Sequence, residues 1–241
     1  MQPVMHNVMR NVLHNVMHNV MHNVLILESS TEDGSVAVAI DGRIASEIVF
    51  TARNPVTGDR TESLAPSISQ ALSEAALEIH ELSAVVCSGG PGGFTSLRSA
   101  AAIAKGICHA LEIPLYSISS LSVLAWSANA VEGSYVAAIA AGRNEWFAAP
   151  FVAAADGGID VGAELIAGAD ELRDMAARGD ARIVGSGFEM QAVPKASAVV
   201  AQLGLVEMAG AVDLDSWEPA YGRLAEAQVK WEAAHGRPLV G

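Results

Sequence analysis

Short apolar blocks separated by turn-forming residues make up the chain between Val24 and Phe50. Their letters are VLILESS, SVAVAID and RIASEIVF, with the turns TEDG and DG between them. Apolar runs of strand length joined by tight Asp-Gly turns are typical of antiparallel β-hairpins. The pattern therefore predicts a three-stranded meander at residues 24–50.

A polar segment and then a helical pattern follow. Residues 51–63, TARNPVTGDRTES, hold turn formers without apolar periodicity, so we expect a mobile loop there. From Ser63 to Leu82 apolar residues return every three or four positions, and Pro66 is tolerable in a first helical turn. This spacing predicts an amphipathic helix over residues 63–82.

Strands and helices alternate in the next part of the chain. SAVVCS at 83–88 is typical of a buried strand, a turn with four glycines follows it, and Thr95–Leu111 has helical character. IPLYSIS at 113–119 predicts another strand, and SLSVLAWSANA at 120–130 a helix behind a serine cap. This alternation after a meander predicts a sheet of mixed direction that is covered on one face.

The second half of the chain begins like the first. Residues 133–153 contain two apolar strands around a polar turn. Two halves that each open with a hairpin predict an α/β protein of two duplicated lobes, at residues 23–130 and 131–241, with the boundary near 129–133. A helix, a strand and a last helical stretch are predicted further on, at 170–179, 181–187 and 222–234.

The first residues form a repeat. MHNVMRNVLHNVMHNVMHNV, residues 5–24, is five copies of one tetrapeptide. In a helix His14, His18 and His22 would stack at i, i+4 spacing and could bind a metal ion. Asn and Val in each repeat weaken a helix, however, and no carboxylate ligand lies nearby. We favour a tandem expansion upstream of a natural start at Met21, and we expect residues 1–22 to be disordered or not native.

Composition narrows the function classes. The formal net charge is −13 and the pI about 4.8, which argues against broad nucleic-acid binding by this chain alone. Cys87 and Cys108 lie in apolar segments, and two cysteines are no disulfide framework, so we expect free buried thiols. Apolar runs are too short for a membrane span. We expect a cytoplasmic protein without a membrane partner.

The turn GGPGG at residues 89–93 has two interpretations. Glycines and the start of the next helix could cradle a phosphate, or they could only allow tight strand-to-helix packing. The turn is neither a P-loop nor a dinucleotide fingerprint. The following helix consists mainly of small residues between Ser99 and Gly106, which would suit packing on the sheet or the close approach of a partner helix. Both alternatives remain open on the residues alone.

The segment GGPGGFTSLRSAAAIAKGICHALEIPLYSISSL, residues 89–121, resembles the bacterial TsaB (YeaZ) family. The run Gly90–Arg98 is its most specific part, and the meander, the ESLAP helix start and PAYGR near the end follow the family's order. The resemblance covers residues 23–238. It implies the actin-like ATPase (ribonuclease H-like) fold, with two duplicated lobes of mixed sheets flanked by helices.

The resemblance also implies a function. TsaB is a subunit of the machinery that makes threonylcarbamoyladenosine in tRNA, and it pairs with the catalytic subunit TsaD through the helix after the glycine turn and the preceding helix. The implied partners are a TsaD-like subunit, a TsaE-like ATPase and, indirectly, tRNA, with a homodimer as the state of the chain alone. The implied partner interface comprises Ser63, Ser67, Ser96, Leu97, Ala100, Ala101 and Ala104.

Several positions depart from the pattern of the catalytic relatives. Their His-x-x-x-His metal pair is absent from YSISSLSVL, residues 116–124, and serine and leucine cannot replace two imidazoles. Glu28 stands where an Asp would face Mg-nucleotide, and Ile139–Gly142 lacks the acid of Ile-Asp-Ala-Arg. We therefore expect no catalytic and no metal-binding residue. The residues left for an anion or nucleotide contact, with ATP or ADP at the partner interface, are Glu28, Gly90, Gly92, Gly93, Thr95 and Arg98.

The leading hypothesis is a non-catalytic subunit that dimerises with a TsaD-type transferase and supports it. The alternatives are an actin-like ATPase or sugar kinase, a glycoprotease-like enzyme, and a homodimeric interaction module. VGSG, residues 184–187, resembles a turn that faces adenosine in actin-like ATPases, which would favour an enzyme. His80 and His109 each stand alone on a predicted helix, so we expect neither to be a ligand.

Overall fold

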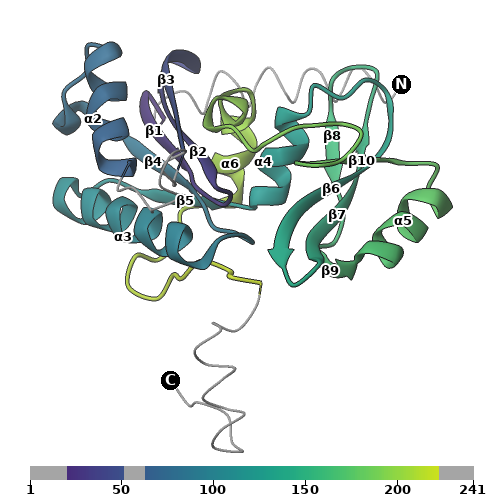
Figure 1. Cartoon of the computed structure of the whole chain (residues 1–241). Helices are drawn as coiled ribbons and strands as arrows, with labels where there is room; N and C mark the ends of the chain where they lie inside the picture. Colours follow the sequence, from purple (N-terminus) through teal and green to yellow (C-terminus); the bar gives the residue numbers. More distant parts are fainter. Residues whose placement is uncertain (1–20, 52–62, 223–241) are drawn as a thin grey trace, which may run out of the picture.

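The computed structural model describes residues 21–51 and 63–222, which form two lobes side by side (Figure 1). The first lobe is built on a five-stranded sheet of order β3-β2-β1-β4-β5. Strands β1 to β3 form the predicted antiparallel meander, and β1, β4 and β5 are parallel. The strands are β1 (Asn23–Glu28), β2 (Asp33–Ile40), β3 (Arg43–Thr51), β4 (Ala84–Ser88) and β5 (Leu115–Ile118).

Two helices cover one face of this sheet, α2 (Leu64–Glu74) and α3 (Phe94–Leu111). Side chains alternate along a strand, so Leu25 and Leu27 of β1 point to the helices. Ala100 and Ala104 of α3 pack into the same core, where their small size brings the helix backbone close to the sheet. Helix α3 thus follows the prediction for Thr95–Leu111 almost residue for residue.

Helix α2 is shorter than the predicted span of residues 63–82. It ends at Glu74 because Ala76 adopts a positive φ of 51° and the Leu77 N–H donates to the carbonyl oxygen of Leu72 at 3.0 Å. This is a left-handed helix termination of the kind that glycine usually supplies. A short 3₁₀ helix, η1 (Ile79–Glu81), continues the chain. Apolar spacing alone does not reveal such a break when alanine occupies the left-handed position.

The opposite face of the first sheet is covered as well, which contradicts the expectation of one covered face. Its cover is η2 (Ala196–Gln202) with α6 (Leu203–Ala209), which come from the far end of the chain. Val199 and Val206 pack there against Ile26 of β1 and Ala37 of β2, and Met21 is buried in the same cluster. Residues placed in the C-terminal half of the sequence thereby complete the core of the first lobe.

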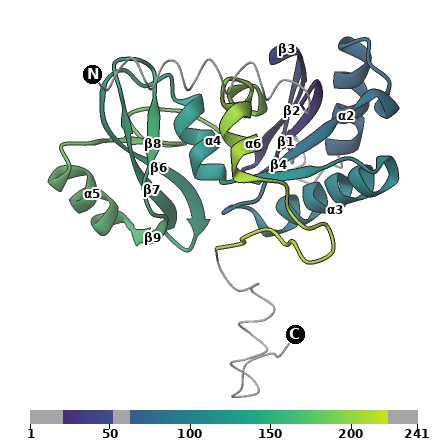
Figure 2. The ribbon, with the colours of Figure 1, turned by 180° about the vertical axis from the view of Figure 1, so that it is seen from behind.

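Helix α4 (Ser120–Ser127) lies between the lobes, beside α6 in both views (Figures 1 and 2). Val123 belongs to the first core, whereas Leu121 and Leu124 belong to the core of the second lobe. A helix that is buried on two sides needs apolar residues around most of its circumference, as SLSVLAWS has. The predicted serine cap is confirmed, because the Ser119 hydroxyl accepts from the Leu121 N–H at 3.1 Å.

The second lobe repeats part of the first. Strand β6 pairs antiparallel with β7 and parallel with β10, as β1 does with β2 and β4, and the lone helix α5 takes the place of α2. The short strands β8 and β9 both pair with β7 and together replace β3. The elements are β6 (Gly133–Gly142), β7 (Glu145–Ala153), β8 (Ile159–Val161), β9 (Leu165–Gly168), α5 (Ala169–Arg178) and β10 (Arg182–Val184).

A last irregular segment, residues 210–222, runs back along the first lobe, and we call it the C-terminal strap. The Val212 N–H donates to the Leu115 carbonyl at 2.8 Å, and the Ala220 N–H donates to the Gly89 carbonyl at 2.7 Å. Its end reaches the second lobe, where Gly222 lies against the ring of Phe147. Residues 52–62 of the loop predicted at 51–63, and all but the first residue of the helical stretch predicted at 222–234, lie outside the described residues. None of the described helices combines the length and the apolar character that a bilayer crossing requires.

Candidate functional site

The glycine turn after β4 is filled by its own chain. Gly90 has a φ of +93°, and a side chain there would overlap the carbonyl oxygen of Ala220 in the C-terminal strap. A side chain on Gly92 would overlap the carbonyl oxygen of Ser30 in the turn between β1 and β2. These two glycines are therefore required because two other backbone segments approach the turn closely.

Hydrogen bonds to other segments occupy two N–H groups and one carbonyl of the glycine turn. The Gly93 N–H donates to the Ser30 carbonyl at 2.8 Å, and the Gly89 N–H donates to the Ile118 carbonyl at 2.7 Å. The carbonyl of Gly90 in turn accepts from the Ser120 N–H at the start of α4. The turn thus joins β1, β5, α4 and the strap. Of the two interpretations that the sequence left open, this geometry favours tight packing over a phosphate cradle.

Glu28 ends β1 and is buried, with 1% of its surface exposed. Its Oε1 accepts from the backbone N–H of Ser30 at 2.7 Å and from the Ser30 hydroxyl, while Oε2 has no hydrogen-bond partner among the described residues. Burial raises the pKa of this carboxyl, and the hydrogen bonds from Ser30 and the Ser88 hydroxyl lower it in part. Glu28 therefore acts inside the lobe, where it fixes the turn that leads to β2.

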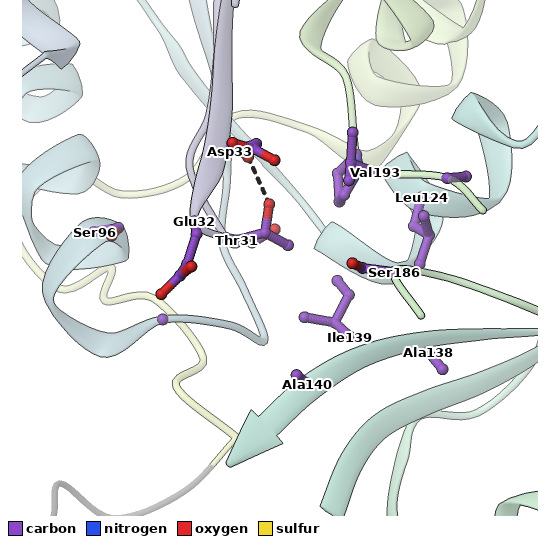
Figure 3. A pocket seen from close by; sticks show the side chains of 14 residues that line it. Thr31, Glu32, Asp33, Ser96, Leu124, Ala138, Ile139, Ala140, Ser186 and Val193 are labelled. Atoms are coloured by element: carbon purple, nitrogen blue, oxygen red, sulfur yellow. Dashed lines mark hydrogen bonds between the residues drawn. The ribbon is translucent and has the colours of Figure 1, made fainter. Parts of the chain in front are cut away.

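A cleft of about 430 Å³ separates the two lobes (Figure 3). Thr31, Glu32 and Asp33, from the turn between β1 and β2, form one wall. The other wall comes from β6, α4 and the segment after β10. Of the residues predicted for either site, only Gly93 and Ser96 line the cleft. The remaining lining residues are Ser30, Leu124, Ala138, Ile139, Ala140, Ser186, Ala192, Val193 and Pro194.

The six residues predicted for an anion or nucleotide contact are not brought together. Gly90 and Gly92 are covered by backbone, and Glu28 is hydrogen-bonded to Ser30. Arg98 is exposed on α3, with its guanidinium 5.4 Å from the centre of the Phe94 ring, and Thr95 is exposed beside it. Because only Gly93 of the six lines the cleft, no common contact with one ligand follows from their positions.

The fold implies Mg-nucleotide in a cleft of this kind, so we tested whether the lining suits it. No Lys or Arg is among the described residues that line it, and Glu32 and Asp33 are its acidic members. In the VGSG segment only Ser186 lines the cleft, and the Gly185 N–H is bound to the Met190 carbonyl at 2.9 Å. The described lining offers no basic donor to the phosphates, so the residues do not fit this group.

The predicted partner interface needs a correction on α3. Leu97, Ala100 and Ala104 are completely buried, with Ala100 and Ala104 in the core of the first sheet, and Ala101 is 5% exposed. They support the helix from beneath and offer no surface to another protein. On α2 Ser67 is buried as well, while Ser63 and Ser96 are half-buried. The exposed small residues of α3 are instead Ser99, Ala102, Gly106 and Ala110.

Packing among residues 21–51 and 63–222 does not require a glycine at position 106. A Cβ built on it would meet nothing within 4 Å, and its φ is not positive. A glycine inside a helix costs about 1 kcal/mol relative to alanine. The outer side of α3 therefore carries a residue that the described part of the chain does not explain. The sequence identifies this helix but not which of its sides is exposed, because small residues occur on both sides.

The described cysteines and histidines do not gather at one place. Cys87 and Cys108 are free and buried, and burial raises the pKa of the Cys108 thiol to about 12, so the thiolate is scarce at neutral pH. The His22 ring pairs with the Asp41 carboxylate across the start of the first lobe. His14 and His18 lie outside the described residues. Within residues 21–51 and 63–222 no three His, Cys, Asp or Glu side chains gather into a metal site.

Comparisons with known proteins decide the family. The family model described as "TsaD: tRNA N6-adenosine threonylcarbamoyltransferase" matches residues 56–231, well over half of the chain. Relatives named "tRNA threonylcarbamoyladenosine biosynthesis protein TsaB" are 36% identical over 101 residues in Buchnera aphidicola and 32% identical over 123 residues in Haemophilus influenzae. The chain belongs to this family, in its TsaB (YeaZ) branch.

A solved structure agrees with this TsaB-branch assignment. A Pseudomonas aeruginosa protein described as similar to the peptidase YeaZ superposes with a TM-score of 0.70 at 25% identity, over 84% of this chain and 100% of that one. The sequence matches cover 42% of this chain and 43% of the Buchnera protein, and 50% of each chain for Haemophilus. The chain thus spans about half or less of the curated relatives it matches. The predicted family and the predicted actin-like fold class are both confirmed.

Proposed function

We propose that this chain is a non-catalytic subunit of the machinery that forms threonylcarbamoyladenosine in tRNA, and that it binds a TsaD-type transferase. The names of its curated relatives support the pathway, and the TsaD family model supports kinship with the partner. Two related proteins can form a heterodimer in which the first lobe of this chain packs against the similar first lobe of the TsaD-type partner. The contact surface is the outer side of α3 together with the exposed side of α2.

The observation that carries the proposal is the unexplained glycine on α3. Ser99, Ala102, Gly106 and Ala110 are exposed and recur at helical spacing, with the exposed Arg98 and His109 beside them, so the backbone of α3 is accessible along this line of small residues. Gly106 weakens the isolated helix, and a Cβ at this position would meet nothing within 4 Å among the described residues. A partner helix whose backbone approaches closely would explain both facts, because only small residues permit that approach.

The absence of catalysis is part of the same proposal. In the segment where catalytic relatives are expected to carry two histidines, Ser119 caps α4 and its hydroxyl donates to the Glu164 carboxylate. A hydroxyl engaged in this way holds α4 against the second lobe and is a poor metal ligand. The cleft beside it does not suit Mg-nucleotide, as described above. The partner would therefore supply the metal, the nucleotide and the chemistry.

The proposal also covers tRNA, the accessory ATPase and the state of the chain alone. With a net charge of −13, this subunit would reach tRNA through basic surfaces of its partners and not through its own. A TsaE-like ATPase would join the same complex, which we place in the cytoplasm. Without its partner the chain would cover the exposed side of α3 by forming a homodimer.

The test is co-purification of the full chain with the TsaD-type protein of the same organism. Ala102→Arg places a long charged side chain on the exposed side of α3 and should reduce recovery of the complex at least about tenfold. Ala177→Arg is a matched control, because Ala177 is an exposed alanine on helix α5 of the other lobe. Leu97 and Ala101 are unsuitable sites, since a change there would disturb the core.

Native mass spectrometry distinguishes the outcomes. The proposal expects a one-to-one complex that Ala102→Arg breaks and Ala177→Arg retains, and a homodimer of the chain alone that the same substitution breaks. It is contradicted if the complex survives Ala102→Arg in a variant whose thermal unfolding is unchanged. Magnesium-dependent ATP hydrolysis by the isolated chain would instead favour the enzyme alternative.

A further inference from the structure

The motif PAYGR, residues 219–223, plays no part in the proposed partner surface. Its first four residues end the C-terminal strap, and we call residues 219–222 the clasp. The Ala220 N–H of the clasp donates to the Gly89 carbonyl at 2.7 Å, and the Ala220 carbonyl fills the space beside Gly90. The clasp thus closes the glycine turn of the first lobe with its own backbone.

Side chains fix the strap to one flank of α3. The centre of the Tyr221 ring lies 4.5 Å from the centre of the ring of Phe94, the first residue of the helix. About three turns further along α3, Lys105 Nζ donates to the Trp217 carbonyl at 3.0 Å. The Trp217 side chain packs against the core beneath the helix. The strap is therefore attached to the first lobe by ring contacts, hydrogen bonds and core packing.

The clasp reaches the second lobe through a glycine. Gly222 has a φ of +67°, and a Cβ built on it would overlap the ring of Phe147 on β7. Phe147 is 4% exposed and belongs to the core of the second lobe. The backbone of the clasp therefore packs directly on a core side chain of that lobe, and a larger residue at position 222 could not approach so closely.

The clasp and α4 attach the lobes to each other at separate places. Helix α4 joins them through Val123 in the first core and Leu124 in the second. The end of the strap, in yellow, lies below α4 in both views (Figures 1 and 2). An attachment along one helix leaves rotation about that helix possible, whereas a further attachment away from the helix removes this freedom.

The position of the clasp beside the interlobe cleft suggests its role. In folds whose two lobes surround a ligand, the bound ligand commonly holds the lobes together. The described lining of this cleft does not suit Mg-nucleotide, as shown above. Gly93 and Ser96 line the cleft, and Phe94 between them in the sequence contacts Tyr221 of the clasp. A bridge between the lobes is thus supplied by the chain itself, next to the cleft.

We propose that the clasp holds the two lobes at one fixed angle, so that the chain is a rigid two-lobed body that needs no ligand in its cleft to stay closed. This inference goes beyond the proposed function and does not rest on partner binding at α3. It is tested on the chain without a partner, so the failure of either proposal leaves the other standing.

The test measures the distance between spin labels on the two lobes of the full chain by double electron–electron resonance. His80→Cys on η1 and Ala177→Cys on α5 place one label at an exposed position of each lobe. Cys87 and Cys108 are buried, and a chain without the new cysteines checks that they take up no label. Mixing with excess unlabelled chain removes distances between two copies. The wild-type clasp should give one narrow distance distribution.

Gly222→Ala should break the attachment to the second lobe, because its Cβ meets the Phe147 ring. The distance distribution should become at least about twofold wider as the lobes begin to move. Gly210→Ala is the matched control in the same strap, since Gly210 also has a positive φ, +88°, but a Cβ on it meets nothing within 4 Å. It imposes a similar backbone strain without the clash and should leave the distribution narrow.

Tyr221→Ala tests the attachment to the first lobe without a steric clash. Loss of the ring contact with Phe94 loosens the clasp from α3, so the distribution should widen as it does for Gly222→Ala. Thermal unfolding checks that each variant is folded, and Tyr221→Ala decides the matter if Gly222→Ala does not fold.

The proposal is overturned by a broad distribution in the wild-type chain, because the lobes would then already move despite the clasp. It is also overturned if the folded Gly222→Ala variant, or in its place the Tyr221→Ala variant, keeps the narrow wild-type distribution. Equal widening by Gly210→Ala and Gly222→Ala would overturn it as well, since backbone strain in the strap and not the contact with Phe147 would then be the cause.

Discussion

The two lobes share a strand plan but differ in how their sheets are covered. The first sheet lies between α2 and α3 on one face and η2, α6 and α4 on the other. The second sheet has α4 on one face, but only the ten-residue helix α5 on the other. Beside α5 a groove of about 270 Å³ remains open along β6 and β7, and Val152 is 53% exposed there.

The difference arises where the two halves of the chain stop repeating each other. After β4 the chain forms α3 and β5, which widen and cover the first sheet. After β10 the corresponding stretch leaves the second lobe and becomes η2 and α6 on the first one. The first lobe thus has an additional layer, η2 and α6, which follows the second lobe in the sequence. A duplicated fold can concentrate its stability in one half in this way, and the half with the complete core carries the candidate partner surface.

The largest expected effect on stability comes from disturbing η2 and α6, the layer that covers the first sheet and has no counterpart on the second. Val199 of η2 is 1% exposed, and Val199→Asp would bury a charge that no basic group of the described core can pair. We expect a loss of about 4 kcal/mol or more in the free energy of unfolding, measured by urea titration. If η2 contributed little to the first lobe, the loss would be a small fraction of this value.

Leu205→Asp is the matched control for that prediction. Leu205 lies on the adjoining helix α6 but is 53% exposed. The same change of side chain should therefore cost less than about 1 kcal/mol.

The same Leu→Ala substitution in each lobe compares how well the two cores can relax around a cavity. Leu97 of α3 and Leu172 of α5 are both fully buried, on corresponding faces of the two lobes. Leu97→Ala should cost about 4 kcal/mol, because the glycine turn and the sheet hold the cavity open, and Leu172→Ala about 2 kcal/mol, because the neighbouring groove lets the site collapse. Urea unfolding of both variants measures the difference. Equal losses would show that the open face of the second sheet does not relax.

The smallest expected effect concerns Glu28, which has no acidic counterpart on β6. Burial raises its folded-state pKa, so the folded state binds this proton more tightly than the unfolded chain does. Its contribution to stability is therefore full below the ordinary carboxyl pKa and is lost as the pH rises through the raised folded value. Glu28→Gln should remove this loss, and the variant should unfold at a higher temperature than the wild type at neutral pH.

Thermal unfolding between pH 4 and pH 8 measures this effect. Glu189→Gln, at an exposed acid of the second lobe, should leave the pH dependence of the wild type unchanged. A Glu28→Gln variant that keeps the full wild-type pH dependence would show that another group causes it.

Much of the fold could be predicted from the apolar pattern. The meander, β4, α3, α4 and the β6–β7 hairpin follow from local periodicity and caps, which are encoded within each segment. The cover of η2 and α6 could not be predicted, because its partners on β1 and β2 lie far away along the chain. Strands β8 and β9 are three and four residues long, too short for a period to appear. The end of α2 was missed because Ala76 adopts a conformation that its residue type does not signal.

The candidate site was less predictable than the fold. The glycine turn was recognised from its letters, but its packing depends on Ser30 and Ala220, which no local pattern connects with it. Ile139 and Val193 line the cleft through the arrangement of the lobes and look like ordinary core residues in the sequence. On α3 the family resemblance identified the correct helix, whereas only the burial of Leu97 and Ala100 distinguishes its inner side from its outer side.

The position of η2, α6 and the strap also affects how the chain is made. A ribosome releases the strands of the first lobe early, but the residues that cover β1 and β2 emerge only after the whole second lobe has been synthesised. The apolar face of the first sheet therefore stays exposed during translation until η2 and α6 have been synthesised. Contacts between segments so far apart in the sequence also form slowly. The lobe that begins first is the last to be completed, and a nascent chain shortened before Val206 would leave it open to aggregation.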